Sequence, residues 1–403
     1  MNAPSAILRG RSAGETPEDA FETRPGGLRL WSIVNSLTSG GAEIFVTSLH
    51  GALAMEGVAT TTLALCDASA LGNSVEMEAR LAQRLRESGS TFASLGLDAG
   101  RPTLRGALAL RRLFERAGRP DVIHAHTVRA IPICALAGWR GPLVVTHHNS
   151  RLSFPPRMFT LFDLFVDHWV AISPDVAAHY RRYSRRPHTP IANAPDSQFT
   201  AASPRGAAAD PPRILSVGAV SDQKHYELLI ETAAHLRSQH ESGTMPLFEI
   251  AGAGEGLAAL REEVRARGLA DTVSFLGERS DVPALMARAD CLLNTSRYEG
   301  MPVSLLEAFA MALPVIATAV AGNRDLVEPD TNGLLSAETP QALAAAISRL
   351  FGEPGLYARL STGSLRSRDR YSMNAAATRH LSLYESLCTA RVSRSGRHTA
   401  RTD

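Results

Sequence analysis

Short apolar segments of strand length alternate with helical segments along most of this 403-residue chain. LRLWSIVNSL at 28–37 precedes a glycine turn and a helical segment, and RILSVGAV at 213–220 precedes another loop and helix. The alternation stops between residues 193 and 212, where Ala, Pro and Ser are frequent and no period is present, and then it resumes. Parallel strands need a crossover connection, usually a helix, so this pattern predicts an α/β fold with two parallel sheets.

The break in the alternation also predicts the domain boundaries. We expect one Rossmann-like domain at 27–192, a linker at 193–212 and a second Rossmann-like domain at 213–370. A last helical segment, at 371–389, is predicted to cross back onto the first domain.

The two ends of the chain lack the features of a folded core. Residues 1–26 are polar, with Pro and Gly, and contain no apolar signal-peptide core. Residues 390–403 carry four arginines and few apolar side chains. We therefore predict a disordered N-terminal arm and a disordered C-terminal tail.

The composition argues against several classes of protein. A formal net charge of +2 disfavours a dedicated nucleic-acid-binding protein, which needs a positive excess to neutralise phosphates. No apolar run reaches the roughly 18 residues of a membrane span. The four cysteines are far apart, so buried free thiols in a cytoplasmic protein are expected rather than a disulfide or zinc framework.

Glycines and histidines follow the predicted strands of the first domain, and open parallel sheets bind ligands beyond these carboxyl ends. Gly40 and Gly41 open a helix, which allows either a backbone anion site or only a tight strand-to-helix turn. His126 lies nearer the strand end than His124, so it is the candidate for a substrate hydroxyl, with a structural histidine as the alternative. A metal site is disfavoured because no carboxylate or cysteine stands at ligand spacing.

Lysine and glycine loops follow the strands of the second domain. Lys224 lies between a predicted strand and a helix, where it is a candidate phosphate contact, although a solvated surface charge is the alternative. The motif GAGEGL at 252–257 fails the dinucleotide fingerprint because Leu257 occupies its last position. The loop from Gly277 to Asp281 is a third segment at a strand end.

The segment SRYEGMPVSLLEAFAMALPVIAT at 296–318 carries two carboxylates with seven residues between them. Glu299 is expected on a loop, and Glu307 inside a helix whose first residue is predicted to be Pro302. The free N–H groups of the three residues that follow the proline then form an anion site suited to a diphosphate. A carboxylate within that helix can accept hydrogen bonds from a vicinal diol.

This segment, extended to Val327, resembles the signature of the retaining family 4 glycosyltransferases. That signature has two Glu separated by seven residues, then Ala-x-Ala-x-Gly-x-Pro-Val and Gly-Gly-x-x-Glu. The segments SGGAE, DVIHAH and ADPPRILSVGAVSDQKHYELLIETA resemble the family's glycine loop, histidine loop and phosphate-binding segment. The resemblance covers about residues 28 to 385. It implies the GT-B fold, in which an acceptor-side domain and a nucleotide-sugar-binding domain face each other across a cleft.

The resemblance also implies a role for each candidate residue. Glu307 holds the ribose of the donor, Glu299 lies at the donor sugar, and Lys224 balances the diphosphate charge. The glycine loop lets the first domain close on the diphosphate, and the histidine touches the sugar at the reaction centre. The predicted catalytic residues are Glu299, His126 and Lys224. The predicted substrate-binding residues, with no metal ligand among them, are Gly40, Gly41, Gly277, Arg279, Gly300, Met301, Pro302, Val303, Ser304 and Glu307.

Five positions depart from the family pattern. Ala219 stands where an Arg is frequent, so one phosphate-binding cation is missing. Ala312, His225 and Ala194 stand where the family commonly has Gly, and Asp325 replaces a Glu. The change at Ala219 bears most on activity because it leaves Lys224 and the helix end to stabilise the leaving group.

The resemblance implies transfer of a sugar, of the hexosyltransferase type, from a nucleotide-diphosphate donor to a hydroxyl of a glycan or lipid-linked acceptor. The anomeric configuration is retained, and no metal or other cofactor is bound. A UDP-sugar is favoured because no residue clearly demands a purine. A sugar-nucleotide epimerase, a phosphorylase and a catalytically weak sugar-nucleotide-binding protein remain alternatives. A glycoside hydrolase is disfavoured because the lysine loop and helix end then have no purpose.

The segment GRPTLRGALALRRLFERAGRPD at 100–121 places five arginines around apolar residues up to position 116. A basic amphipathic face can meet anionic lipid, while a solvated helix packed on the sheet is the plainer interpretation. We expect a cytoplasmic protein, with peripheral contact at the inner face of the membrane as an open possibility. A role in cell-envelope or exopolysaccharide synthesis follows from the resemblance.

Overall fold

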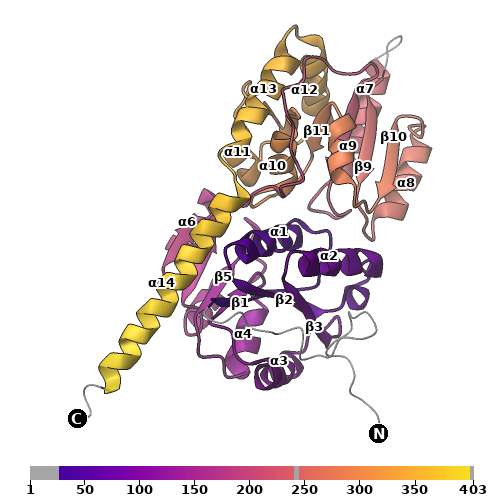
Figure 1. Cartoon of the computed structure of the whole chain (residues 1–403). Coiled ribbons are helices and arrows are strands. Elements are labelled where there is room, and N and C mark those ends of the chain that lie inside the picture. Colours follow the sequence, from indigo (N-terminus) through magenta and orange to yellow (C-terminus); the bar gives the residue numbers. More distant parts are fainter. Residues whose placement is uncertain (1–26, 240–244, 400–403) are drawn as a thin grey trace. The chain divides into compact units, whose positions relative to one another are not determined.

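The computed structural model describes residues 27–239 and 245–399 (Figure 1). The chain divides into two compact units. Among the described residues, the first unit comprises 27–148, 152–192 and 373–399, and the second comprises 149–151, 193–239 and 245–372. The predicted N-terminal arm and the last four residues of the predicted tail lie outside the described residues.

The first unit contains a seven-stranded sheet in the order β3-β2-β1-β4-β5-β6-β7, and all neighbouring strands are parallel. Most strand residues are buried, as expected for a parallel sheet covered on both faces. The strands are β1 (Arg29–Val34), β2 (Ala59–Cys66), β3 (Thr91–Leu97), β4 (Val122–Ala125), β5 (Leu143–Thr146), β6 (His168–Ala171) and β7 (His188–Pro190).

The helices of the first unit lie in two layers. Right-handed crossovers place α1 and α2 on one face of the sheet, and the reversed direction from β3 to β4 places α3 to α6 on the other. Figure 1 shows α1 and α2 on the opposite side of the sheet from α3 and α4. The helices are α1 (Gly41–Met55), α2 (Val75–Glu87), α3 (Thr103–Ala117), α4 (Ala130–Leu136), α5 (Met158–Phe162), α6 (Pro174–Tyr183) and α14 (Met373–Thr399), with a 3₁₀ turn η2 (Ala68–Leu71).

The second unit contains a six-stranded parallel sheet in the order β10-β9-β8-β11-β12-β13. Together with the first sheet, it confirms the prediction of two parallel-sheet α/β domains. The strands are β8 (Arg213–Val217), β9 (Leu247–Ala251), β10 (Val273–Gly277), β11 (Cys291–Asn294), β12 (Val315–Thr318) and β13 (Gly333–Ser336). The helices are α7 (Tyr226–Gln239), α8 (Leu257–Ala266), α9 (Val282–Arg288), α10 (Val303–Ala310), α11 (Ala321–Leu326), α12 (Pro340–Gly352) and α13 (Leu356–Arg368).

Two helices begin at a hydroxyl residue followed by proline, a start that can be recognised in the sequence. The Val176 N–H donates to Ser173 Oγ at 3.3 Å before α6, and the Ala342 N–H donates to Thr339 Oγ1 at 3.3 Å before α12. The proline that follows each cap has no N–H to satisfy, and its fixed φ suits the first helical residue.

The last helix, α14, packs against α1 in the first unit. It continues to Thr399, whereas the sequence predicted that the helix ends at residue 389 and that a disordered tail begins at 390. The added residues include no proline, and three of them are arginines, which have a high helix propensity, so the helix can continue.

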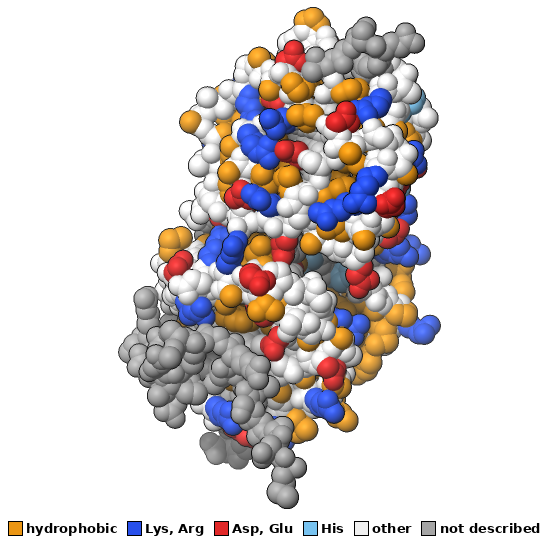
Figure 2. Space-filling view, turned by 90° about the vertical axis from the view of Figure 1, so that its right-hand side faces the viewer, with side chains coloured by type: hydrophobic (Ala, Val, Ile, Leu, Met, Phe, Trp, Pro, Cys, Tyr) orange, Lys and Arg blue, Asp and Glu red, His pale blue; other side chains and the backbone are white. Residues whose placement is uncertain are grey.

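The surface carries charges of both signs. On the face drawn in Figure 2, Lys and Arg side chains are interspersed with Asp and Glu side chains, in keeping with the formal net charge of +2. Within the described part of the chain, none of the helices is both long enough and apolar enough to cross a membrane.

Close packing of α13 in the second unit gives a stability prediction. A methyl group on Gly363 would lie 1.8 Å from the Thr331 carbonyl oxygen, whereas one on Gly352 would meet nothing within 4 Å. We therefore expect Gly363→Ala to lower the free energy of unfolding by about 1–3 kcal/mol, the usual cost of overpacking. Urea unfolding should show Gly352→Ala within about 0.5 kcal/mol of the wild type. Equal stability of the two variants would contradict the packing described here.

Candidate active site

In the second unit, the strand order reverses between β8 and β11, which are neighbours in the sheet. Ligands of open parallel sheets bind at such a switch point, beyond the carboxyl ends of the strands. Lys224 lies on the loop after β8 and Glu299 on the loop after β11. The structure brings these two predicted residues together, with Lys224 Nζ donating to Glu299 Oε1 at 2.6 Å.

The Glu299 carboxylate is almost fully buried and is held by several donors. Its side chain is 7% exposed, and that of Lys224 is 18% exposed. Ser296 Oγ donates to Oε1 at 2.7 Å, and Gln223 Nε2 approaches Oε2 at 3.3 Å. Burial of a charge is costly unless the charge is paired and hydrogen-bonded, and loss of one partner leaves an uncompensated charge. The pair therefore fixes a cation and an anion at the switch point.

Glycines allow the loops after β8 and β9 to approach backbone to backbone. A methyl group on Gly252 would lie 1.9 Å from the Gly218 carbonyl oxygen, and one on Gly254 would lie 2.1 Å from the Val220 carbonyl oxygen. The aliphatic part of Lys224 lies over Gly218, where a Cβ would meet Lys224 Cε at 2.6 Å. The glycines of GAGEGL thus serve this close approach, which positions the lysine.

The helix that carries Glu307, α10, begins at Val303, so the prediction that Pro302 is its first residue was wrong. Pro302 is the N-cap, with φ −67° and an extended ψ of 116°. Proline suits this φ but does not decide on which side of the helix boundary the residue falls. The Leu305 N–H donates to the Pro302 carbonyl at 3.2 Å, so it is not one of the free donors that the sequence predicted. Glu307 is 7% exposed.

The loop before α10 is held on both sides by residues of the same unit. Asn193 Nδ2 donates to the Met301 carbonyl at 3.1 Å, which ties the start of the linker to this loop. A methyl group on Gly322 would lie 2.7 Å from the carbonyl oxygens of both Glu299 and Gly300. A glycine at the start of α11 is therefore required for the loop to take this position.

The loop from Gly277 to Asp281, which the family resemblance implies contacts the base mainly through its backbone, follows β10. Gly277 has a φ of 72°, in the left-handed region that favours glycine. The Arg279 guanidinium makes two hydrogen bonds to the Asp281 carboxylate, at 2.7 and 2.6 Å, and the two side chains are 41% and 44% exposed. The contact of this loop with a base stays a prediction.

Two of the positions that depart from the family pattern have a positive φ. His225 and Ala312 have φ values of 51° and 54°, in the region where glycine is favoured. Ala312 follows the C-cap of α10, and the Leu313 N–H donates to the Ala308 carbonyl at 2.9 Å, the bond of a Schellman motif. Ala219 is exposed at the end of β8, so an arginine side chain there would not be buried.

The glycine loop of the first unit lies where its own strand order reverses, between β1 and β4. Gly40 is the N-cap of α1 and Gly41 is its first residue. A methyl group on Gly40 would lie 2.5 Å from Glu43 Oε2, so the glycine makes room for this carboxylate. Burial raises the pKa of Glu43 to about 7. Sequence reasoning missed Glu43, although an acid at the third helical position is a capping signal.

His126 belongs to a group of buried histidines in the first unit. Its Nδ1 lies 2.8 Å from His148 Nε2, and its ring centroid lies 4.1 Å from that of His124. His124 in turn contacts the Tyr384 hydroxyl at 2.7 Å and Thr146 Oγ1 at 2.8 Å. The hydroxyl belongs to α14, so this helix supports the histidine group, a contact that nothing local in the sequence indicates.

Burial lowers the pKa of His126 well below its usual value, and the neighbouring histidines lower it further. The imidazole is therefore neutral at physiological pH, and one ring nitrogen can accept a hydrogen bond. His126 Nε2 is buried and has no hydrogen-bond partner in the structure, so it can contact a ligand. Among the residues that the structure describes, no group of His, Cys, Asp and Glu could hold a metal ion.

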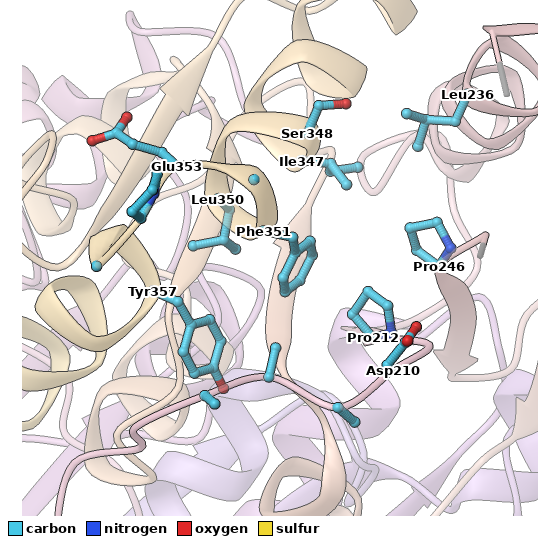
Figure 3. Close-up of a pocket in the computed structure, with 16 residues that line it drawn as sticks. Asp210, Pro212, Leu236, Pro246, Ile347, Ser348, Leu350, Phe351, Glu353 and Tyr357 are labelled. Carbon is cyan, nitrogen blue, oxygen red and sulfur yellow. The ribbon is translucent and has the colours of Figure 1, made fainter. Parts of the chain in front are cut away.

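A cavity of about 560 Å³ in the second unit lies away from the switch point (Figure 3). Its lining includes Pro212 and Pro246, which directly precede β8 and β9, so the cavity lies at the amino ends of these strands. Phe351 and Tyr357 line it too, with ring centroids 6.2 Å apart. Donor binding is expected at the opposite edge of the sheet.

Comparison with known proteins agrees with this geometry. The model for Glycosyltransferase Family 4 matches residues 39–196, and the model for Glycosyl transferases group 1 matches residues 198–365. The structure of HepE from Anabaena in complex with UDP and glucose superimposes with a TM-score of 0.72 at 20% identity, over 89% of this chain and all of that one. The chain therefore belongs to the family 4 glycosyltransferases and has the GT-B fold.

Two relatives illustrate how far the similarity extends. Alpha-D-kanosaminyltransferase from Streptomyces kanamyceticus is 31% identical over 183 residues, which are 44% of this chain and 46% of that protein. The lipopolysaccharide core biosynthesis glycosyltransferase LpsE from Rhizobium meliloti is 26% identical over 80% of this chain and 88% of that protein. The chain thus matches less than half the length of the first relative and most of the second.

Proposed function

We propose that this protein transfers a sugar from a nucleoside-diphosphate donor to a hydroxyl of a glycan or lipid-linked acceptor. The observation that carries the proposal is the Lys224–Glu299 pair at the switch point of the second unit. The loop that carries Glu299 leads into α10, and the N-terminus of this helix adds positive potential. A cation, a helix start and a buried carboxylate on adjoining loops suit a donor that combines a diphosphate with a polyol.

In this proposal Lys224 stabilises the departing diphosphate. An ammonium group has three N–H donors, and the pair with Glu299 uses one of them. The remaining donors and the start of α10 can then meet the charge that develops as the glycosidic bond breaks, which is electrostatic catalysis. No bound metal is needed in this scheme because the lysine and the helix end supply the positive charge.

Glu299 and Glu307 have different parts in the proposal. Glu299 accepts hydrogen bonds from the lysine and from Ser296, which hold its carboxylate on the loop after β11, and in the proposal it contacts the donor sugar from there. Glu307 is buried inside α10 and accepts hydrogen bonds from the ribose diol. The predicted roles of Gly40, Gly41 and His126 concern the first unit and stay predictions.

The proposed reaction retains the anomeric configuration. The acceptor hydroxyl attacks the face from which the diphosphate departs, and the diphosphate takes up the hydroxyl proton. This scheme needs no nucleophilic side chain, and the ion-paired Glu299 is suited to holding the sugar.

A sugar-nucleotide epimerase and a catalytically weak sugar-nucleotide-binding protein are the alternatives. The exposed alanine at position 219, in place of a frequent arginine, favours the second of these because it removes one phosphate-binding cation. Release of free nucleotide that depends on acceptor separates transfer from both alternatives.

The names of the relatives suggest the biological setting. LpsE acts, by its name, in lipopolysaccharide core biosynthesis, and HepE was solved in complex with UDP and glucose. We propose that this protein uses a UDP-sugar of the hexose type in the synthesis of a cell-envelope or extracellular polysaccharide. The proposed location is the cytoplasm, where UDP-sugars are available.

The proposal predicts the products of a donor screen. UDP-, GDP- and ADP-sugars are incubated in chelator with the protein and either a membrane extract or a soluble oligosaccharide. We expect nucleoside diphosphate release that depends on acceptor, and an anomeric coupling constant in the product, measured by NMR, that matches the donor. A product of inverted anomeric configuration would contradict the proposed retention. Nucleotide release without any glycosylated product would contradict the proposed sugar transfer.

The two carboxylates give a second prediction. Glu307→Ala should weaken donor binding by about 1–3 kcal/mol, because a buried ribose hydroxyl then loses its partner. Glu299→Ala should lower kcat more than it raises KM, because its partner is the sugar at the reaction centre. Calorimetry and steady-state kinetics measure the two effects. If both variants lose only affinity, the proposed division of roles is wrong.

A further inference from the structure

The exposed large hydrophobic side chains of the described residues are unevenly distributed. All of them belong to the first unit, and most lie on the helical layer formed by α3, α4 and α5. The members in this layer are Leu104, Leu108, Leu136, Leu161, Leu164 and Phe165, with exposures between 42% and 70%. We call this set, with the arginines of α3, the apolar–arginine face. Single exposed apolar residues are ordinary, but several on one helical layer, in which α3 packs against α4, point to an interaction surface.

Helix α3 cannot turn its exposed leucines inward. Leu104 and Leu108 are four residues apart and so share one side of the helix, while Leu110 and Leu113 on the other side are buried. Gly106 brings α3 close to α4, since a Cβ there would lie 2.9 Å from Ile133 Cδ1. The tight packing of α3 against its neighbour fixes the outward direction of the leucines.

The same helix concentrates positive charge. Helix α3 contains four arginines and one carboxylate, Glu115, whereas the whole chain has a formal net charge of only +2. Arg111 pairs with Glu115 at 3.5 Å and Arg105 with Asp98 at 3.4 Å, but all four side chains are more than half exposed. Exposed pairs of this kind contribute little, so the guanidinium groups can exchange these partners for other anions.

We propose that the apolar–arginine face docks on an anionic phospholipid surface. Leucine side chains at this face enter the boundary between headgroups and acyl chains, and the arginines pair with lipid phosphates. The combination favours a membrane over a nucleic acid, because a nucleic acid backbone offers no apolar region in which the exposed leucines could be buried. The sequence pointed only to α3, and the structure adds the apolar residues of α4 and of the turn after α5. This inference goes beyond the proposed transfer and does not depend on it.

Vesicle binding without any donor tests the inference on the full-length protein. Vesicles of phosphatidylglycerol and phosphatidylcholine in equal amounts are compared with phosphatidylcholine alone by co-sedimentation. We expect binding to the anionic vesicles that falls with added salt. Arg105→Gln with Arg112→Gln should weaken it by about fivefold per arginine. Leu104→Ser with Leu108→Ser should weaken it at least as much, because these side chains insert.

Arg261→Gln with Arg265→Gln is the matched control, since it removes the same charge from two exposed positions on α8 of the second unit. This variant should bind like the wild type. A Leu108→Trp reporter should shift its fluorescence to the blue on anionic vesicles, because position 108 enters the headgroup region. Circular dichroism confirms that each variant is folded.

Several results would overturn the inference. They are absence of binding to anionic vesicles, equal binding to neutral vesicles, and equal losses in the α3 and control variants. Self-association that the leucine substitutions abolish, without vesicle binding, would make this face a protein interface instead. A variant that loses vesicle binding but still glycosylates a soluble acceptor would separate the docking surface from the proposed transfer.

Discussion

The ion pair between Lys224 and Glu299 is the interaction around which the second unit is organised at its ligand-binding edge. It connects the loops after β8 and β11, the two neighbouring strands at which the strand order reverses. The lysine can reach the carboxylate because Gly218 leaves room for its aliphatic part, and Gly252 lets the next loop approach closely. The strand order positions the two loops, and the glycines leave room for the lysine side chain and for the neighbouring loop. The pair then places charges of both signs at the edge where ligands of a parallel sheet bind.

The first unit depends on burial rather than on charge. The rings of His126 and His124 lie against each other at a tilt of 35°, and α14 contributes the hydroxyl of Tyr384 to this group from a position 260 residues along the chain from His124. Because burial lowers the pKa of both imidazoles, the group acts as a set of neutral hydrogen-bond donors and acceptors. A neutral imidazole at the end of β4 can accept a hydrogen bond from a hydroxyl group.

The sequence predicted the two parallel sheets because strand and helix periods alternate, and the structure confirms them. It also placed Lys224 and Glu299 at strand ends, although only the three-dimensional order of β8 and β11 shows that they meet. The exact start of α10 could not be predicted, since the φ of Pro302 suits both the N-cap and the first helical position. Contacts such as Tyr384 with His124 join distant segments, and no local pattern reports them.

The affinity of the second unit for a diphosphate tests the central claim most directly. Titration calorimetry of the full chain compares UDP with uridine for the wild type, for Lys224→Met, and for Lys224→Met combined with Glu299→Gln, which removes the unpaired buried charge. We expect Lys224→Met and the double variant to lose about tenfold or more in UDP affinity, the value of about one charge-assisted hydrogen bond, and to bind uridine as the wild type does. Equal losses for UDP and uridine, or no loss for UDP in the folded double variant, would contradict the assignment of the diphosphate to Lys224.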